Sequence, residues 1–191
     1  LCLIALIIIP STKRLKTLAV SKIGSPLGWL IVKEGIDSQD DNGKYTVPYK
    51  AMVCSCGKYT PKSGTYKTSN KYAWRPLVHD VYGQYATRIV KKILFHSVPY
   101  STNKKDALLY EEYDKLGTKA SEGCIRLTVK DAKWIYDNCP SGTMVEFYSD
   151  SNPGPLGKPT AQKISSVEEC KKIYGLGVDC EYRIISVVEV K

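Results

Sequence analysis

The chain opens on a run of nine apolar residues, LCLIALIII, which ends at Pro10. As a helix this run would span only about 13 Å, less than half of a hydrocarbon core roughly 30 Å thick. Because it cannot cross a bilayer by itself, we interpret residues 1–10 as the end of a signal peptide or membrane anchor. A buried N-terminal strand is the alternative. Residues 11–28 contain four basic residues and no acidic ones, and we expect a basic linker there.

From Trp29 onward, short β-rich runs alternate with turns. WLIV (29–32) and KYTVPYKAMVC (44–54) are typical of two strands, and Asn42-Gly43 between them is a strong hairpin signal. We expect further strands at TYKTSNKYAW (65–74), RIVKKILF (88–95) and TMVEFY (143–148). Segment 99–120 is polar and lacks a sustained period, which predicts a long loop with a short helical piece near 108–113.

One helix is well specified by its ends and by its apolar face. Thr128 can cap it, and Asp131 three residues later completes a variant of the capping box. Pro140 and Gly142 end it. The residues predicted to share its apolar face are Val129, Ala132, Tyr136 and Cys139.

These elements predict a mainly β fold with one principal helix, of the α+β class, over residues 29–149. Pro and Gly are dense in residues 151–159, which marks a boundary. We therefore expect residues 150–191 to form a linker and a C-terminal tail.

Composition and charge exclude several classes of function. Lys and Arg outnumber Asp and Glu by 28 to 19, but without the basic stripe or interleaved aromatic residues of a nucleic-acid-binding protein. The chain has two histidines, so a metal site with three imidazole ligands is excluded. Nothing implies a cofactor, and we expect neither a metal nor a nucleic-acid partner.

Seven cysteines agree with an exported protein, because disulfides persist outside the cytosol. Cys54 and Cys56 lie two apart on a predicted strand, so both point to one face, either packed there or paired elsewhere. Cys139, Cys170 and Cys180 are candidates for a disulfide that staples the tail, with a connectivity that the sequence leaves open. A cysteine-stapled structural protein is accordingly one class to consider.

The sequence KASEGCIRL (119–127) carries the candidate chemistry. Cys124 follows Gly123 on a turn before the capped helix, where neighbouring amides can stabilise an oxyanion. A position at a helix start and the nearby charge of Arg126 would favour the thiolate. A thiolate nucleophile needs a base, which can be His79 or His96. His96 ends the most apolar strand whereas His79 lies in a polar loop, so we favour His96.

These residues resemble the catalytic domain of the bacterial L,D-transpeptidases, the YkuD-type cysteine enzymes that cross-link peptidoglycan. The resemblance covers about residues 29–149. It rests on four motifs, FHSVP, SEGCIRL, DAKWIYDN and GTMVEFY, and on AMVCSCGKYTPKSGTYKT, which is similar to a strand-turn-strand with a TPxG motif. It implies an L,D-transpeptidase-like β-sandwich.

The resemblance also implies a mechanism. Cys124 attacks the donor stem tetrapeptide, D-Ala leaves, and the thioester is attacked by the amine of an acceptor stem peptide. Cys124 would be the nucleophile and His96 the base, with the imidazole held by the carbonyl of Ser97. The amides of Gly123 and Cys124 would stabilise the oxyanion. Ser121 would shape the turn, and Tyr82 and Tyr85 would contact the substrate. Arg126 is either a substrate-carboxylate contact or an ion-pair partner of Glu122 or Asp131.

Three features depart from the family pattern. Glu122 stands where a histidine often precedes Gly-Cys, Arg126 stands where Asn is often found, and the 28 residues from His96 to Cys124 exceed the common spacing.

The implied partners are peptidoglycan stem peptides. The implied location is extracytoplasmic, at the cell wall or the outer face of the plasma membrane, either secreted or anchored through residues 1–10. An L,D-carboxypeptidase using the same Cys/His pair and a non-catalytic wall-binding module are the alternatives.

Overall fold

The computed structural model describes residues 2–9, 17–23, 28–34 and 48–149, together with 159 and 163. The elements are β1 (Cys2–Ile9), β2 (Thr17–Ile23), β3 (Gly28–Glu34), β4 (Pro48–Gly57), β5 (Gly64–Lys67), β6 (Lys71–Pro76), the 3-10 helix η2 (Val78–Asp80), β7 (Tyr82–Val90), β8 (Ile93–Ser97), α1 (Tyr110–Tyr113), β9 (Lys119–Ser121), β10 (Ile125–Leu127), α2 (Val129–Asn138) and β11 (Met144–Ser149). This confirms a mainly β fold with one principal helix.

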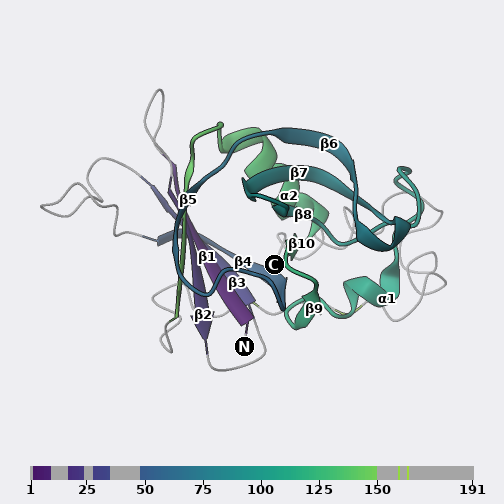
Figure 1. Cartoon of the computed structure of the whole chain (residues 1–191), viewed down its shortest axis with the longest axis horizontal. Helices are drawn as coiled ribbons and strands as arrows, with labels where there is room; N and C mark the ends of the chain where they lie inside the picture. The colour runs from purple at the N-terminus through teal and green to yellow at the C-terminus, as the bar shows by residue number, and fades with distance from the viewer. Residues whose placement is uncertain are drawn as a thin grey trace, which may run out of the picture.

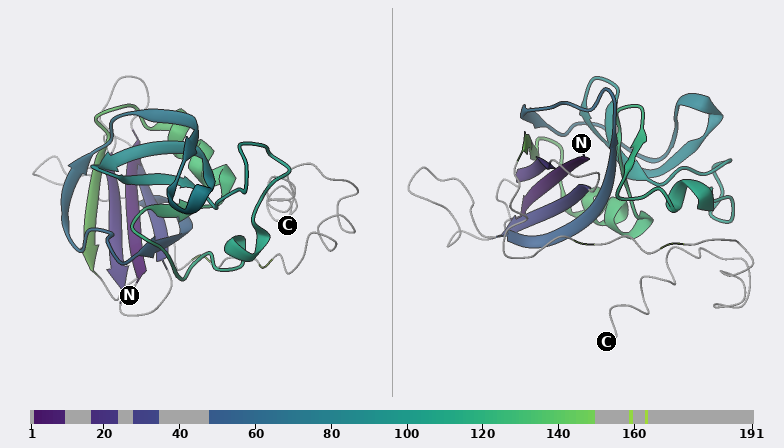
Figure 2. Two further views of the ribbon diagram at one scale, coloured as in Figure 1. Left: turned by 45° about the vertical axis from the view of Figure 1, so that its right-hand side comes forward. Right: turned by 90° about the horizontal axis from the view of Figure 1, so that it is seen from below.

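The strands join into a strongly curled sheet (Figures 1 and 2). Its order is β5-β11-β2-β1-β3-β4-β10-β8-β7-β6, with β9 paired to β4 and an additional pairing of β2 with β3. The expected hairpin of β3 and β4 is confirmed by their antiparallel register, in which Leu30 opposes Met52. The turn between these strands lies outside the described residues.

The N-terminal apolar run belongs to the sheet. Strand β1 pairs with β2 on one side, where Ile7 opposes Leu18, and in parallel with β3 on the other, where Ile7 opposes Val32. This matches the alternative expectation of an N-terminal strand, and the interpretation of residues 1–10 as the end of a signal peptide or anchor stays a prediction. Part of the expected linker, Thr17–Ile23, is likewise strand β2. An Ile-rich run suits such a position because β-branched residues favour strands.

In the part of the chain that the structure describes, no helix combines the length and apolar character that crossing a membrane requires.

The predicted strand 88–95 is in fact a hairpin. Strands β7 and β8 are antiparallel, with Val90 opposite Ile93, and the chain turns at Lys91 and Lys92. Lys91 has the left-handed φ of 49°. The two lysines lie in the turn between apolar strand ends, so the expectation of one continuous strand was wrong. The predicted strand 65–74 also divides, into β5 and β6.

Helix α2 begins as predicted. The amide of Asp131 donates to the Thr128 side chain at 3.1 Å, which is the N-cap hydrogen bond. Val129, Ala132 and Ile135 are buried. Ile135 is therefore the core residue of the last turn, and Tyr136, which we expected on this face, is half-buried.

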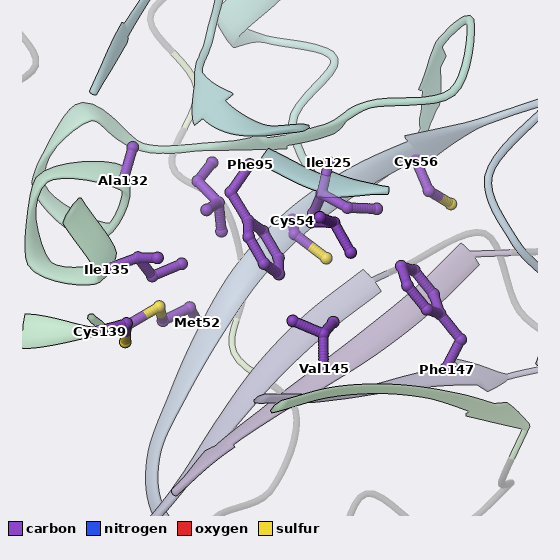
Figure 3. Close-up of a cluster of buried hydrophobic side chains, with 12 residues drawn as sticks. Met52, Cys54, Cys56, Phe95, Ile125, Ala132, Ile135, Cys139, Val145 and Phe147 are labelled. Carbon is purple, nitrogen blue, oxygen red and sulfur yellow. The ribbon is translucent and has the colours of Figure 1, made fainter. Parts of the chain in front are cut away.

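The sheet curls around a core that α2 closes (Figure 3). This cluster also includes Cys54, Cys56 and Cys139, all fully buried. Cys54 and Cys56 thus share one face of β4, as expected. The predicted tail disulfide remains a prediction, because Cys170 and Cys180 lie outside the described residues.

Candidate active site

The parallel pairing of β8 with β10 brings together the segments that carry the predicted nucleophile and base. Arg126 is the register partner of His96, and Ile125 is that of Phe95. Because side chains alternate along a strand, Ile125 and Phe95 enter the core while Arg126 and His96 take the opposite face. Cys124 lies two residues before Arg126, in the turn that leads into β10. The structure therefore places Cys124 at the start of the strand that pairs with the strand of His96.

The His96 imidazole is held in a defined orientation. Its Nδ1 lies 2.5 Å from the carbonyl oxygen of Ser97. A donor at Nδ1 leaves Nε2 as the nitrogen that can accept a proton. Burial lowers the pKa of His96 to about 4, the Ser97 hydrogen bond opposes this shift, and the charge of Arg126 adds to it. The ring is consequently neutral near pH 7 and available as a base.

Strand β7 fixes the position of this ring. A Cβ atom on Gly83 would lie 2.9 Å from Nδ1 of His96 and 3.0 Å from its Cβ. Next to it, the amide of Gln84 donates to Oγ of Ser97 at 2.9 Å, and this hydroxyl donates to the carbonyl of Val98 at 2.8 Å. Ser97 is therefore held from both sides, and only a glycine fits against the imidazole.

Cys124 rests as a thiol. Its Sγ donates to the carbonyl of Lys92, 3.5 Å away in the β7–β8 turn. Burial raises the pKa of Cys124, against a backbone hydrogen bond at Leu94 and the charges of Arg126 and Arg88. The expectation that a helix start favours the thiolate was wrong, because β10 follows Cys124 and α2 begins only at Val129.

Side-chain and backbone contacts clamp the turn that carries Cys124. Ser121 Oγ donates to the Cys124 carbonyl at 2.6 Å, so it shapes the turn. Thr60 Oγ1 donates to the Gly123 carbonyl at 2.8 Å, and the Tyr59 amide donates to the carbonyl of Glu122 at 2.7 Å. Three consecutive carbonyls are thus tied down, which holds their peptide groups in place.

Two of the residues behind this clamp were not assigned a role from the sequence. Thr60 is the first residue of TPKSG, and its hydroxyl also accepts the amide of Gly57 at 2.8 Å. A Cβ atom on Gly57 would lie 1.9 Å from the Ser121 carbonyl oxygen, so the two backbones can approach only at a glycine. The TPxG-like motif and the Cys-Gly pair before it were the available signals.

Arg126 has a different partner from those expected. It forms an ion pair with Glu112 of α1, which also pairs with Lys115. Asp131 instead pairs with Lys50 at 3.5 Å. Arg126 therefore ties the catalytic strand to the segment between β8 and β9. No spacing rule links Glu112 to Arg126, so this ion pair was not predicted from the sequence.

Three candidate residues from the sequence remain: Tyr85, Tyr82 and His79. Tyr85 packs on α2, with its ring 5.6 Å from that of Tyr136, and joins the core cluster. It packs on the core side of the sheet, and its expected substrate contact stays a prediction. Tyr82 is next to Gly83 and bridges to Tyr100. His79 is 77% exposed, as expected, and its Nε2 lies 4.0 Å from the carboxylate of Glu122.

The described residues contain no group of three or more His, Cys, Asp or Glu side chains arranged to hold a metal ion. What they do contain is a buried neutral imidazole, a thiol in the turn before the neighbouring strand, and side-chain contacts that fix this turn. This set of groups suits nucleophilic acyl transfer.

Comparisons with known proteins agree with this chemistry. The family model of the L,D-transpeptidase catalytic domain, YkuD, matches residues 38–147, more than half of the chain. The Bacillus subtilis (strain 168) protein named "Putative L,D-transpeptidase YciB" is 56% identical over 54 residues, which are 28% of this chain and 27% of that protein. The chain thus spans only a part of this curated relative.

Solved structures show a weaker likeness. L,D-transpeptidase 1 of Mycobacterium tuberculosis is 16% identical, with a TM-score of 0.40, covering 76% of this chain and 59% of that one. An L,D-transpeptidase from Stackebrandtia nassauensis is also 16% identical, with a TM-score of 0.42 and coverage of 79% and 58%. On the strength of the family-model match across the sheet, the clamped turn and α2, the chain belongs to the family of L,D-transpeptidase catalytic domains.

Proposed function

We propose that this domain is a peptidoglycan L,D-transpeptidase that works through a thioester on Cys124. One observation carries the proposal: Cys124 immediately precedes β10, which pairs in parallel with the strand of His96, and the Ser97 carbonyl orients the imidazole. Family membership and the acyl-transfer geometry support the same reaction class.

The resting protonation states determine how the first step proceeds. A thiol is a weak nucleophile, so its proton must move to Nε2 of His96 as Sγ attacks the donor carbonyl. The C–S bond forms, the C–N bond to the terminal D-Ala breaks, and His96 returns the proton to the leaving amine. The amides of Gly123 and Cys124 belong to the turn whose carbonyls are tied down, and we assign them to stabilise the oxyanion.

The second step runs the same chemistry in reverse. The acceptor amine attacks the thioester, the C–N bond forms, the C–S bond breaks, and His96 carries the amine proton to the sulfur. Water in place of the amine gives the carboxypeptidase outcome with the same two residues.

We also propose that the protein acts outside the cytoplasmic membrane, because a cross-linking enzyme has to meet its stem peptides in the wall. The support is the chemistry of the proposed substrate.

Mass spectrometry with a carbapenem tests the core of the proposal. We expect one covalent adduct, on the peptide that contains Cys124, none in Cys124→Ala, and much slower formation in His96→Ala. A donor tetrapeptide with an acceptor then separates cross-linking from hydrolysis by product. Retention on wall material without any adduct would support a binding module and overturn the enzyme proposal.

A further inference from the structure

We propose that Glu122 recognises the positively charged primary amine of the acceptor, and that His79 is a positioning residue for its carboxylate. The inference rests on the proposed function, since an acceptor is needed only if Cys124 forms a thioester. It concerns the position where this chain departs from the family pattern.

Glu122 is held close to the reacting atoms by the backbone. It precedes Gly123 and Cys124, and two residues span at most about 7 Å. Its carbonyl accepts the Tyr59 amide at 2.7 Å, and the next carbonyl accepts Thr60 Oγ1 at 2.8 Å. The carboxylate therefore extends from a point that is fixed relative to Sγ.

The Glu122 carboxylate is also accessible. Its side chain is 60% exposed, and the ion-pair partner in reach is the His79 imidazole rather than a lysine or arginine. At 4.0 Å from Nε2 to Oε1 this contact is too long for a hydrogen bond, so it leaves the carboxylate oxygens accessible to another donor. By contrast, Glu112 pairs with Arg126 and Lys115, and Asp131 pairs with Lys50. At this turn, the Glu122 carboxylate is therefore the one available to bind a cationic ligand.

The loop that carries His79 has an unusual backbone. His79 and Asp80 have the left-handed φ values of 64° and 52°. Such a conformation costs a non-glycine residue roughly 1 kcal/mol and is found preferentially where function requires it. The amide of Leu77 closes the loop on the carbonyl of Val81 at 2.8 Å, above the β6–β7 pairing. This loop carries the imidazole whose Nε2 lies 4.0 Å from the Glu122 carboxylate.

A carboxylate at this point would act on binding. A primary amine is protonated near neutral pH and forms a charge-assisted hydrogen bond to a carboxylate. Before attack the bound ammonium releases one proton to solvent. A second proton passes to His96 as the C–N bond forms and the C–S bond breaks. Loss of the carboxylate should therefore raise the acceptor KM more than it lowers kcat.

Glu122→Gln in the full chain tests the inference, with Glu111→Gln as the matched control. Glu111 is an exposed residue of α1, and the control removes the same charge. Two nucleophiles are compared: a cationic primary amine and hydroxylamine, which is uncharged near neutral pH. We expect Glu122→Gln to raise KM for the amine about five- to tenfold and to leave KM for hydroxylamine unchanged. Glu111→Gln should change neither, and His79→Gln should raise the amine KM about twofold.

The outcomes separate the two proposals. If the unaltered chain forms no carbapenem adduct at Cys124, the proposed function fails. If the adduct forms but Glu122→Gln affects both nucleophiles equally, or neither, only the role of Glu122 is overturned. Adduct formation by Glu122→Gln itself shows that the variant is folded and that its thiol is reactive.

Discussion

Strands β8 and β10 have two faces with different surroundings: one packs into the core, and the other carries residues of the candidate site. On one face Phe95, Ile125 and Leu127 are fully buried in the core between the curled sheet and α2. On the other face lie His96 and Arg126, next to Cys124 in the turn before β10, and we propose His96 and Cys124 as the reactive pair. Because alternate residues of one backbone serve both faces, packing on the core side positions the reactive side chains. Side-chain period and register thus convert ordinary apolar packing into catalytic geometry.

Burial also has different consequences on the two faces. It stabilises the apolar side chains through removal of their surface from water. For the titratable pair it favours the uncharged forms, so it lowers the pKa of His96 and raises that of Cys124. Both groups therefore rest uncharged, and in the proposed mechanism the proton moves from the thiol to the imidazole during attack.

The largest expected effect separates the faces by stability. Phe95→Ala should lower the free energy of unfolding by about 3–5 kcal/mol, because it leaves a cavity in the core. Cys124→Ser should change it by no more than about 1 kcal/mol, since this side chain is half-buried and outside the core cluster, yet it should abolish the carbapenem adduct. Urea denaturation and mass spectrometry measure both. Equal destabilisation by the two variants would contradict the division of faces.

A second prediction concerns pH. The folded pKa of His96 is about 4, against about 6.5 for a histidine in an unfolded chain. Between these values the unfolded state binds more protons, so stability falls as the pH falls through this window. The expected loss between neutral pH and pH 4 is about 3 kcal/mol. Urea denaturation across this range measures it.

His96→Gln provides the control for this pH effect. Asp131 and Glu112 also have shifted pKa values, but they remain in the variant, so their contributions cancel in the difference. In this variant the part of the pH dependence of the unfolding free energy that comes from His96 should disappear. An unchanged pH dependence in His96→Gln would show that the imidazole is not held neutral by burial.

Local signals predicted the parts of the molecule that depend on near neighbours in sequence. The Thr128 cap and the face of α2 follow from spacing within one helix, and the Gly123-Cys124 pair with His96 gave the candidate reactive residues, whose role stays a prediction. The hairpin at Lys91 was missed because an apolar run on both sides of two lysines has the pattern of one strand.

The remaining errors involve contacts between distant residues. Arg126 meets Glu112, and Tyr85 meets α2, only after the sheet curls. The pKa of Cys124 depends on burial more than on nearby charges, and burial is a property of the assembled fold. The spacing of residues along the sequence carries no information on these distant contacts or on burial.

The smallest expected effect tests how closely the two faces are coupled through Gly83. An added Cβ would lie 2.9–3.0 Å from the His96 side chain, so Gly83→Ala must displace the ring by a few tenths of an ångström. We expect a loss of about 1 kcal/mol in stability and about a tenfold slower adduct formation, because misplaced catalytic groups lose rate steeply. A double-mutant cycle with His96→Ala measures the cause: without the ring only the 3.0 Å approach to the Cβ of residue 96 remains, so Gly83→Ala should cost less stability. If its cost is the same with and without His96, the glycine serves the strand alone and does not position the base.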